Sequence, residues 1–238
     1  MKTRKEVLDI VGDYLLQQSL NQKQEKKEFS HDDLLMKELL NEIRQLGYYV
    51  DDFWLQVQNI IDVRLIDVYK KYIHKFDKKS ITDRIIAYLG CKEYKEATEY
   101  CIEMYRKEIL QEEYDGVGGL KWRWGRTIYE ICDGRYVDTY LELIQEKSEI
   151  EKQCRNFSEI ILLLSKLKER RAIPIILSYL DIENNKYWLN GVVIEALGNY
   201  RDLEYVKYIT PFLTDKDSYT RNKAKAAIKK IENANKGK

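Results

Sequence analysis

The segment from Ala172 to Ile231 contains two consecutive helix–turn–helix units of nearly equal length, and this repeat constrains the fold most. Leu164 and Leu197 lie 33 positions apart, and Leu180 and Leu213 end two successive first helices at the same spacing. The second helices align at an offset of 31, because the turn of the earlier unit is two residues longer. A period in the low thirties with apolar residues at helical spacing predicts stacked helical hairpins.

The repeat can be traced backwards from this segment. A step of 33 positions leads from Leu164 to Ile131, which extends the repeat to about Leu120. Before Leu120 the period is not found. We therefore divide the chain into divergent N-terminal helical hairpins or a cap over 1–115 and a repeat region over 116–238. The repeat region ends in a basic capping helix, and the two parts are expected to form one continuous array.

The N-terminal half also reads as helical. Apolar spacing predicts helices over 3–20, from Ser30 to Gly47, from Asp51 to Phe76, from Ser80 to Leu89, and from Tyr94 to Leu110. Alternation at a period of two does not persist anywhere over four to eight residues, so no strand is predicted. The expected fold class is all-α without a β-sheet.

The two clearest units resemble HEAT repeats. The resemblance rests on LDIENNKYWLNGVVIEALGNY and LTDKDSYTRNKAKAAIKKI, with Asp181 and Asp215 in the turns and Arg221 at the start of a second helix. The sequence departs from the family pattern at Asn190, which replaces the arginine, and in the shifted position of its prolines. The resemblance implies a right-handed α-solenoid whose second helices line a concave face.

The composition limits the classes of function that the chain can have. Lysine and arginine total 41 against 40 acidic residues, which does not favour a dedicated nucleic-acid binder. The four cysteines and two histidines show no metal-ligand spacing, and Cys101 and Cys132 fall on apolar helical faces as buried free thiols. No secretory or membrane-spanning pattern is found, so we expect a cytoplasmic protein that holds no cofactor and no metal.

One row of side chains recurs along the repeat. Trp122, Arg126 and Tyr129 share a helical face, and the repeat carries that face to later second helices. The first row is Trp122, Arg155, Trp188 and Tyr219; the neighbouring rows supply Glu159, Lys223 and Glu195. Tryptophan, tyrosine and arginine dominate interface hot spots, so these nine residues are the predicted partner-binding site. The competing interpretation packs Trp122 and Trp188 into the core, where Trp124, Thr127, Ile128 and Ile131 are also expected.

The other sequence motifs give little indication of a binding or catalytic site. The glycines at positions 116, 118 and 119 precede a helix and could hold an anion, but an ordinary turn between repeats explains them better. No catalytic constellation is found, because no nucleophile motif accompanies the two histidines.

Three functions remain open, and one of them, a repair or lyase-type accessory array that acts on modified proteins, is indicated by no specific residue. The favoured one is a non-enzymatic protein-binding module, and its narrower form is an immunity protein that neutralises a toxin or nuclease domain. The alternative is a DNA-binding enzyme, because some alkylpurine DNA glycosylases are similar HEAT-like arrays; Trp122, Arg126, Asp133 and Trp188 would fill the roles of their groove residues. A mixed or acidic face favours protein, and a continuous basic face favours DNA.

Overall fold

Every regular element in the computed structural model is a helix, within the described residues 29–109, 119–145, 157–180 and 187–236. This agrees with the predicted all-α class; the helix expected over 3–20 lies outside these ranges. The α-helices are α2 (His31–Gln45), α3 (Phe53–Gln56), α4 (Leu65–Tyr72), α5 (Lys79–Tyr88), α6 (Thr98–Ile109), α7 (Leu120–Ile131), α8 (Val137–Gln145), α9 (Ser158–Lys166), α10 (Ile173–Ser178), α11 (Tyr187–Tyr200), α12 (Val206–Ile209) and α13 (Ser218–Asn235). Short 3₁₀ helices lie at Val57–Asn59, Lys95–Ala97, Gly134–Tyr136, Arg170–Ala172, Leu203–Tyr205 and Thr210–Thr214.

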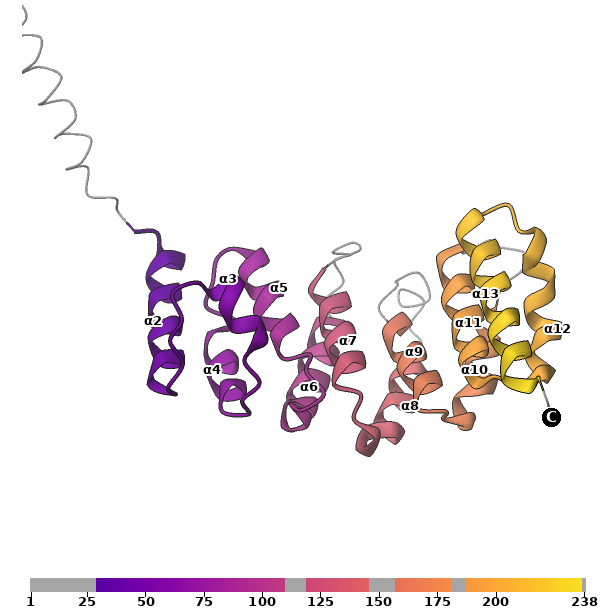
Figure 1. The fold of residues 1–238 in the computed structure, drawn as a ribbon, viewed down its shortest axis with the longest axis horizontal. Coiled ribbons are helices and arrows are strands. Elements are labelled where there is room, and N and C mark those ends of the chain that lie inside the picture. Colours follow the sequence, from indigo (N-terminus) through magenta and orange to yellow (C-terminus); the bar gives the residue numbers. More distant parts are fainter. Residues whose placement is uncertain (1–28, 110–118, 146–156, 181–186, 237–238) are drawn as a thin grey trace, which may run out of the picture.

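The helices follow one another in chain order along a single row, from α2 at one end to α12 and α13 at the other (Figure 1). Their buried apolar side chains form one continuous cluster along the row. The four predicted core residues of α7 are buried: Trp124, Thr127, Ile128 and Ile131. Cys101 is buried as predicted, but Cys132 is half-buried because it follows the last turn of α7 in a left-handed conformation.

The predicted start and end of α2 are confirmed. Ser30 Oγ accepts a hydrogen bond from the backbone of Asp33 at 3.2 Å, and the Asp33 carboxylate accepts one from the backbone of Ser30 at 3.1 Å. This reciprocal pair satisfies two backbone amides at the helix start. The helix ends before Gly47, whose φ of 99° is readily adopted only by glycine.

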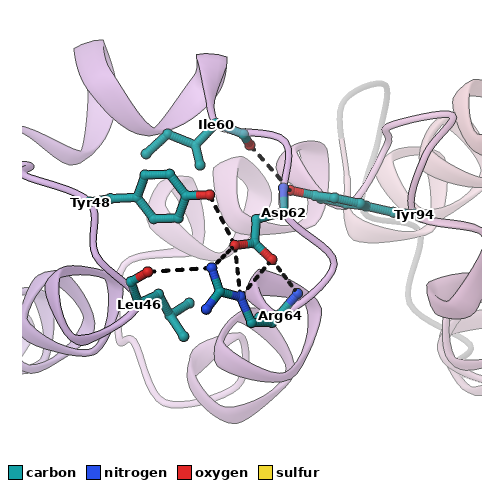
Figure 2. A network of polar contacts seen from close by, with 6 residues as sticks. All are labelled: Leu46, Tyr48, Ile60, Asp62, Arg64 and Tyr94. Atoms are coloured by element: carbon teal, nitrogen blue, oxygen red, sulfur yellow. Dashed lines mark hydrogen bonds and ion pairs between the residues drawn. The ribbon is translucent and has the colours of Figure 1, made fainter.

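The single long helix predicted from Asp51 to Phe76 is wrong. The backbone becomes extended at Ile60, so α3 and α4 are separate helices. Asp62 accepts hydrogen bonds from the backbone amide of Arg64 at 2.9 Å and from its guanidinium, and the Tyr94 hydroxyl donates to the Ile60 carbonyl at 3.2 Å (Figure 2). An aspartate bonded to a nearby backbone amide competes with helical hydrogen bonding, and here the competition ends the helix.

The hydrogen bond from a carboxylate to the backbone amide two residues later, seen at Asp62, recurs in three later turns. Three described residues other than glycine have positive φ, at 54°, 62° and 61°, and an acidic residue follows each: Cys132 before Asp133, Lys168 before Glu169, and Arg201 before Asp202. Each carboxylate accepts a hydrogen bond from the backbone amide two residues later and so starts a 3₁₀ helix. These turns are 36 and 33 residues apart. The turns that follow α7 and α9 are 36 residues apart, whereas the sequence repeat is traced from Leu164 to Ile131 with a step of 33. The step used in the sequence is therefore three residues too short for these two turns.

Helices α11 and α13 lie parallel and in close contact. Successive contacts follow both helices in the same direction: Gly191 with Tyr219, Glu195 with Lys223, Gly198 with Ala227, and Asn199 with Lys230. The glycines allow close approach, because a Cβ atom on Gly198 would lie 2.8 Å from the Ala227 Cβ. This packing fixes which side chains of the two helices share a surface.

Removing the hydroxyl group is expected to change the free energy of unfolding in opposite directions at two buried tyrosines. Tyr140 Oη is buried without a hydrogen-bond partner in the described part of the chain, whereas Tyr179 Oη donates to the Ile144 carbonyl at 2.6 Å. We expect Tyr140→Phe to raise the free energy of unfolding by about 1 kcal/mol and Tyr179→Phe to lower it by a similar amount. Urea unfolding followed by circular dichroism measures both; equal destabilisation by the two variants would contradict the difference in pairing.

Candidate functional site

Helices α7, α9, α11 and α13 pack against one another in that order, so side chains on one side of them form a common surface. Seven of the nine predicted partner-binding residues have described side chains on these helices, and we call them the polar–aromatic face: Trp122, Arg126, Tyr129, Glu159, Glu195, Tyr219 and Lys223. Arg155 lies outside the described residues. Trp188 belongs to α11, but its side chain is outside the described part.

Arg126 is the centre of one half of this face. Its Nε donates to Glu130 on the same helix at 2.8 Å, and its Nη1 lies 3.5 Å from Glu159 Oε2 on α9. The guanidinium also lies 5.0 Å from the centre of the Tyr129 ring, within cation–π range. The Trp122 indole is close enough to the Glu159 carboxylate to help lower its pKa. These contacts join α7 to α9 through an ordered cluster of opposite charges.

Glu159 is the most constrained member of the face. Its side chain is 9% exposed, and Oε2 has no hydrogen bond within the described residues despite the ion pair with Arg126. Burial raises the pKa of the Glu159 carboxyl above its ordinary value, and the nearby Arg126 and Trp122 offset this only in part. An ionised Glu159 therefore lowers the stability of the folded protein.

We expect Glu159→Gln to raise the free energy of unfolding by about 1 kcal/mol at pH 8. A carboxyl group with a raised folded pKa stabilises the fold only when protonated, and that stabilisation is lost as the pH rises through the folded pKa. The gain from the amide should therefore shrink at pH 4. Urea unfolding at the two pH values tests this. Glu195→Gln is the matched control, because the Glu195 carboxylate is 39% exposed and paired. If the gain in unfolding free energy from Glu159→Gln did not depend on pH, the burial argument would be contradicted.

The second half of the face lies between α11 and α13. Lys223 forms an ion pair with Glu195. Burial by itself would lower the pKa of Lys223, but the hydrogen bond to Glu195 raises it, so the lysine stays charged. The Tyr219 ring covers Gly191 and is 45% exposed, with the Lys223 ammonium 5.4 Å from its centre. An adjoining hollow of about 150 Å³ is lined by Glu195, Lys223, Ala226, Ala227 and Lys230.

Tyr129 connects the two halves. Burial raises the pKa of its hydroxyl most, the Arg126 guanidinium opposes this, and the carboxylates of Glu195 and Glu159 raise the pKa further. Lys166 also approaches the Tyr129 ring, with Nζ 4.4 Å from the centre. The face is therefore continuous from α7 to α13 and alternates in charge.

Sequence reasoning missed two contributors to the face. Arg123 forms two hydrogen bonds with Asp83 of α5, at 2.7 and 2.9 Å, and lies 4.9 Å from the Trp122 ring centre. Gly191 provides the flat surface under Tyr219. Neither contact follows the repeat spacing, because the first joins the repeat region to α5 and the second depends on the absence of a side chain.

Asp133 is not available for chemistry. Its side chain is 1% exposed, its two oxygens accept hydrogen bonds from Arg135, and Thr98 donates to it at 3.3 Å. In the described ranges, no three histidine, cysteine, aspartate or glutamate side chains lie close enough to share a metal ion. None of the described helices is long and apolar enough to cross a membrane.

Neither a protein-family model nor a curated protein matches this chain. The contacts of its own residues are therefore the basis for inferring function.

Proposed function

We propose that this chain is a non-enzymatic protein-binding module and that the polar–aromatic face is its contact surface. The observation that carries the proposal is the pairing of charges on the face: Arg126 with Glu130 and Glu159, and Lys223 with Glu195. Paired charges beside the exposed Tyr219 ring and the half-buried Trp122 and Tyr129 rings suit a protein surface of complementary charge. A nucleic-acid backbone instead requires cations that are free to neutralise phosphates.

We further propose that the array is a right-handed α-solenoid of the HEAT type, with α7, α9, α11 and α13 on its concave side. The successive packing of these helices and the recurring turns after α7, α9 and α11 support this arrangement. Within this architecture, the narrower hypothesis is an immunity protein that neutralises a toxin or nuclease domain. Glu130 and Glu195 would offer carboxylates to a basic partner, because their side chains are 34% and 39% exposed.

The alkylpurine DNA glycosylase alternative receives no specific support. The role given to Asp133 would need an accessible carboxylate at that position, and phosphate binding would need unpaired cations on the face. Asp133 is buried, however, and Arg126 and Lys223 are ion-paired. We therefore propose the protein-binding function alone.

Site-specific photo-crosslinking in native-host extract tests the proposal. A photoreactive phenylalanine analogue at Tyr219 should capture one stoichiometric protein partner, because Tyr219 is the most exposed aromatic side chain of the face. The same analogue at Tyr208, an exposed tyrosine of α12, is the matched control and should not capture that protein. Salt-sensitive retention on duplex DNA, with no protein adduct from position 219, would reject the proposal in favour of the enzyme.

A further inference from the structure

A second surface lies where α11 and α13 end, beyond the polar–aromatic face. An open cavity of about 470 Å³ is lined there by Arg201, Ala226, Lys229, Lys230, Asn233 and Ala234. Three of these six residues are cationic, one is an amide and two are alanines. The lining therefore offers hydrogen-bond donors around a floor of small side chains.

Asn199 holds Lys230, which lines this cavity, next to a second lysine, Lys168, which lies outside the lining. The Lys168 ammonium donates to the Asn199 backbone carbonyl, and the Lys230 ammonium donates to Asn199 Oδ1 at 2.5 Å. The Asn199 amide in turn donates to Ser165 Oγ at 2.8 Å, which fixes its orientation. One asparagine thus draws together lysines from the turn after α9 and from α13.

The turn that carries Arg201 is also fixed. Arg201 has a φ of 61°, and its carbonyl accepts a hydrogen bond from Asn235 Nδ2 at 2.9 Å. This contact ties the end of α11 to the end of α13. The Arg201 side chain therefore reaches the cavity from a braced turn.

The positive charges in this cluster oppose one another. Burial lowers the pKa of the Lys168 ammonium, and the neighbouring Arg201 and Lys230 lower it further. No carboxylate in the described part of the chain forms an ion pair with Lys168, Arg201, Lys229 or Lys230. Elsewhere on the same helices, Lys223 is paired with Glu195. A group of like charges without a counter-ion is electrostatically unfavourable until an anion joins it.

We infer that Lys168, Arg201, Lys229 and Lys230 form a binding site for a small anion with two or more adjacent phosphate groups. Several cations meet at one cavity, which suits a compact ligand of high charge density. Arginine binds phosphate oxygens through two parallel hydrogen bonds, and lysine acts as a point charge. Asn233 adds an amide donor to the lining, and the volume falls within the usual range for small-molecule sites.

Isothermal titration of the full chain with inorganic pyrophosphate tests this site. We expect saturable binding that weakens about tenfold in Lys230→Gln, because a charge-assisted hydrogen bond is lost. Lys225→Gln is the matched control: Lys225 is an exposed lysine of α13 that does not line the cavity, and its variant should bind within about twofold of the wild type. Both variants must keep the wild-type circular dichroism spectrum.

Thermal unfolding provides a second readout. Pyrophosphate at one fixed concentration should raise the Tm of the wild type and of Lys225→Gln by similar amounts, and that of Lys230→Gln by less. Without ligand, Lys230→Gln should have a Tm equal to or above that of the wild type, because glutamine retains a donor for Asn199 and removes a repulsive charge.

Three results would overturn the inference. The first is no binding of pyrophosphate by the wild type at millimolar concentration. The second is equal weakening in Lys225→Gln and Lys230→Gln, which would show diffuse charge attraction. The third is tighter binding of a short DNA duplex at equal phosphate concentration, which would assign the cluster to a nucleic-acid backbone. Each of these three results can be obtained whatever the outcome of the crosslinking experiment at Tyr219.

Discussion

Replacing Gly198 with valine is expected to lower the free energy of unfolding by about 3 kcal/mol. A Cβ atom at this position would lie 2.8 Å from the Ala227 Cβ and 3.0 Å from the Ala227 Cα. The contacted atoms are the Cβ and the backbone of Ala227, which cannot rotate away as the end of a long side chain can. The added methyl groups must therefore separate the two helices. Chemical unfolding followed by circular dichroism measures the loss.

Gly191→Ala is the matched control for this prediction. Its Cβ would lie even closer to the Tyr219 ring than a Cβ at Gly198 would lie to Ala227, but the contacted atoms belong to a side chain that is 45% exposed. The Tyr219 ring can rotate away, and alanine favours the helix over glycine by about 1 kcal/mol. We expect the stability to change by less than about 1 kcal/mol. A loss at Gly191 equal to that at Gly198 would mean that the distance alone, not the rigidity of the contacted atom, sets the cost.

Local sequence signals predicted several of the helix ends in the N-terminal half. Ser30, Gly47 and Gly90 mark boundaries that the structure places within one or two residues, because capping and chain reversal depend on adjacent residues. The failure between Asp51 and Phe76 has a different origin. Apolar spacing continues through this segment, but the hydrogen bonds among Asp62, Arg64 and Tyr94 break the helix, and Tyr94 is 32 residues from Asp62.

The repeat spacing predicted part of the candidate site. It placed Glu159 opposite Arg126, and these residues form an ion pair between α7 and α9. It did not predict the pairing of Glu195 with Lys223, which lie 28 positions apart. The spacing of contacting residues therefore differs between the two pairs of helices, so a step of one repeat identifies the first pair but not the second.

The basic cavity could not be predicted from the sequence for a related reason. Seven basic residues follow from Arg221 to Lys238, and along the chain they indicate only a basic capping helix. The fold brings part of this run together with Lys168 and Arg201, which come from two earlier turns. Because those turns lie some 30 and 60 positions before Lys230, no local spacing in the sequence indicates that these cations meet.

Asp133→Ala is expected to lower the free energy of unfolding by about 3 kcal/mol. The Asp133 side chain is 1% exposed and starts the 3₁₀ helix after α7 by accepting a hydrogen bond from the backbone of Arg135 at 3.1 Å. It also accepts hydrogen bonds from the Arg135 guanidinium and from Thr98 of α6. Alanine would leave a backbone amide and a buried hydroxyl without their acceptor. Chemical unfolding at pH 7 measures the effect.

Asp133→Asn separates the charge from the hydrogen bonds. Burial by itself would raise the pKa of Asp133, but the hydrogen bonds from Arg135 bring it below the ordinary value. A carboxylate with a lowered folded pKa contributes stability above its unfolded pKa, and this contribution is lost as the pH falls through the folded pKa. The difference between wild type and Asp133→Asn should therefore be largest at neutral pH and shrink as the pH falls below the ordinary pKa of aspartate, about 4. Asp202→Ala, at the corresponding turn but with a 33% exposed side chain, should cost less than Asp133→Ala. Equal losses at the two turns would show that capping alone, and not the burial of Asp133 against Thr98, makes this turn important for stability.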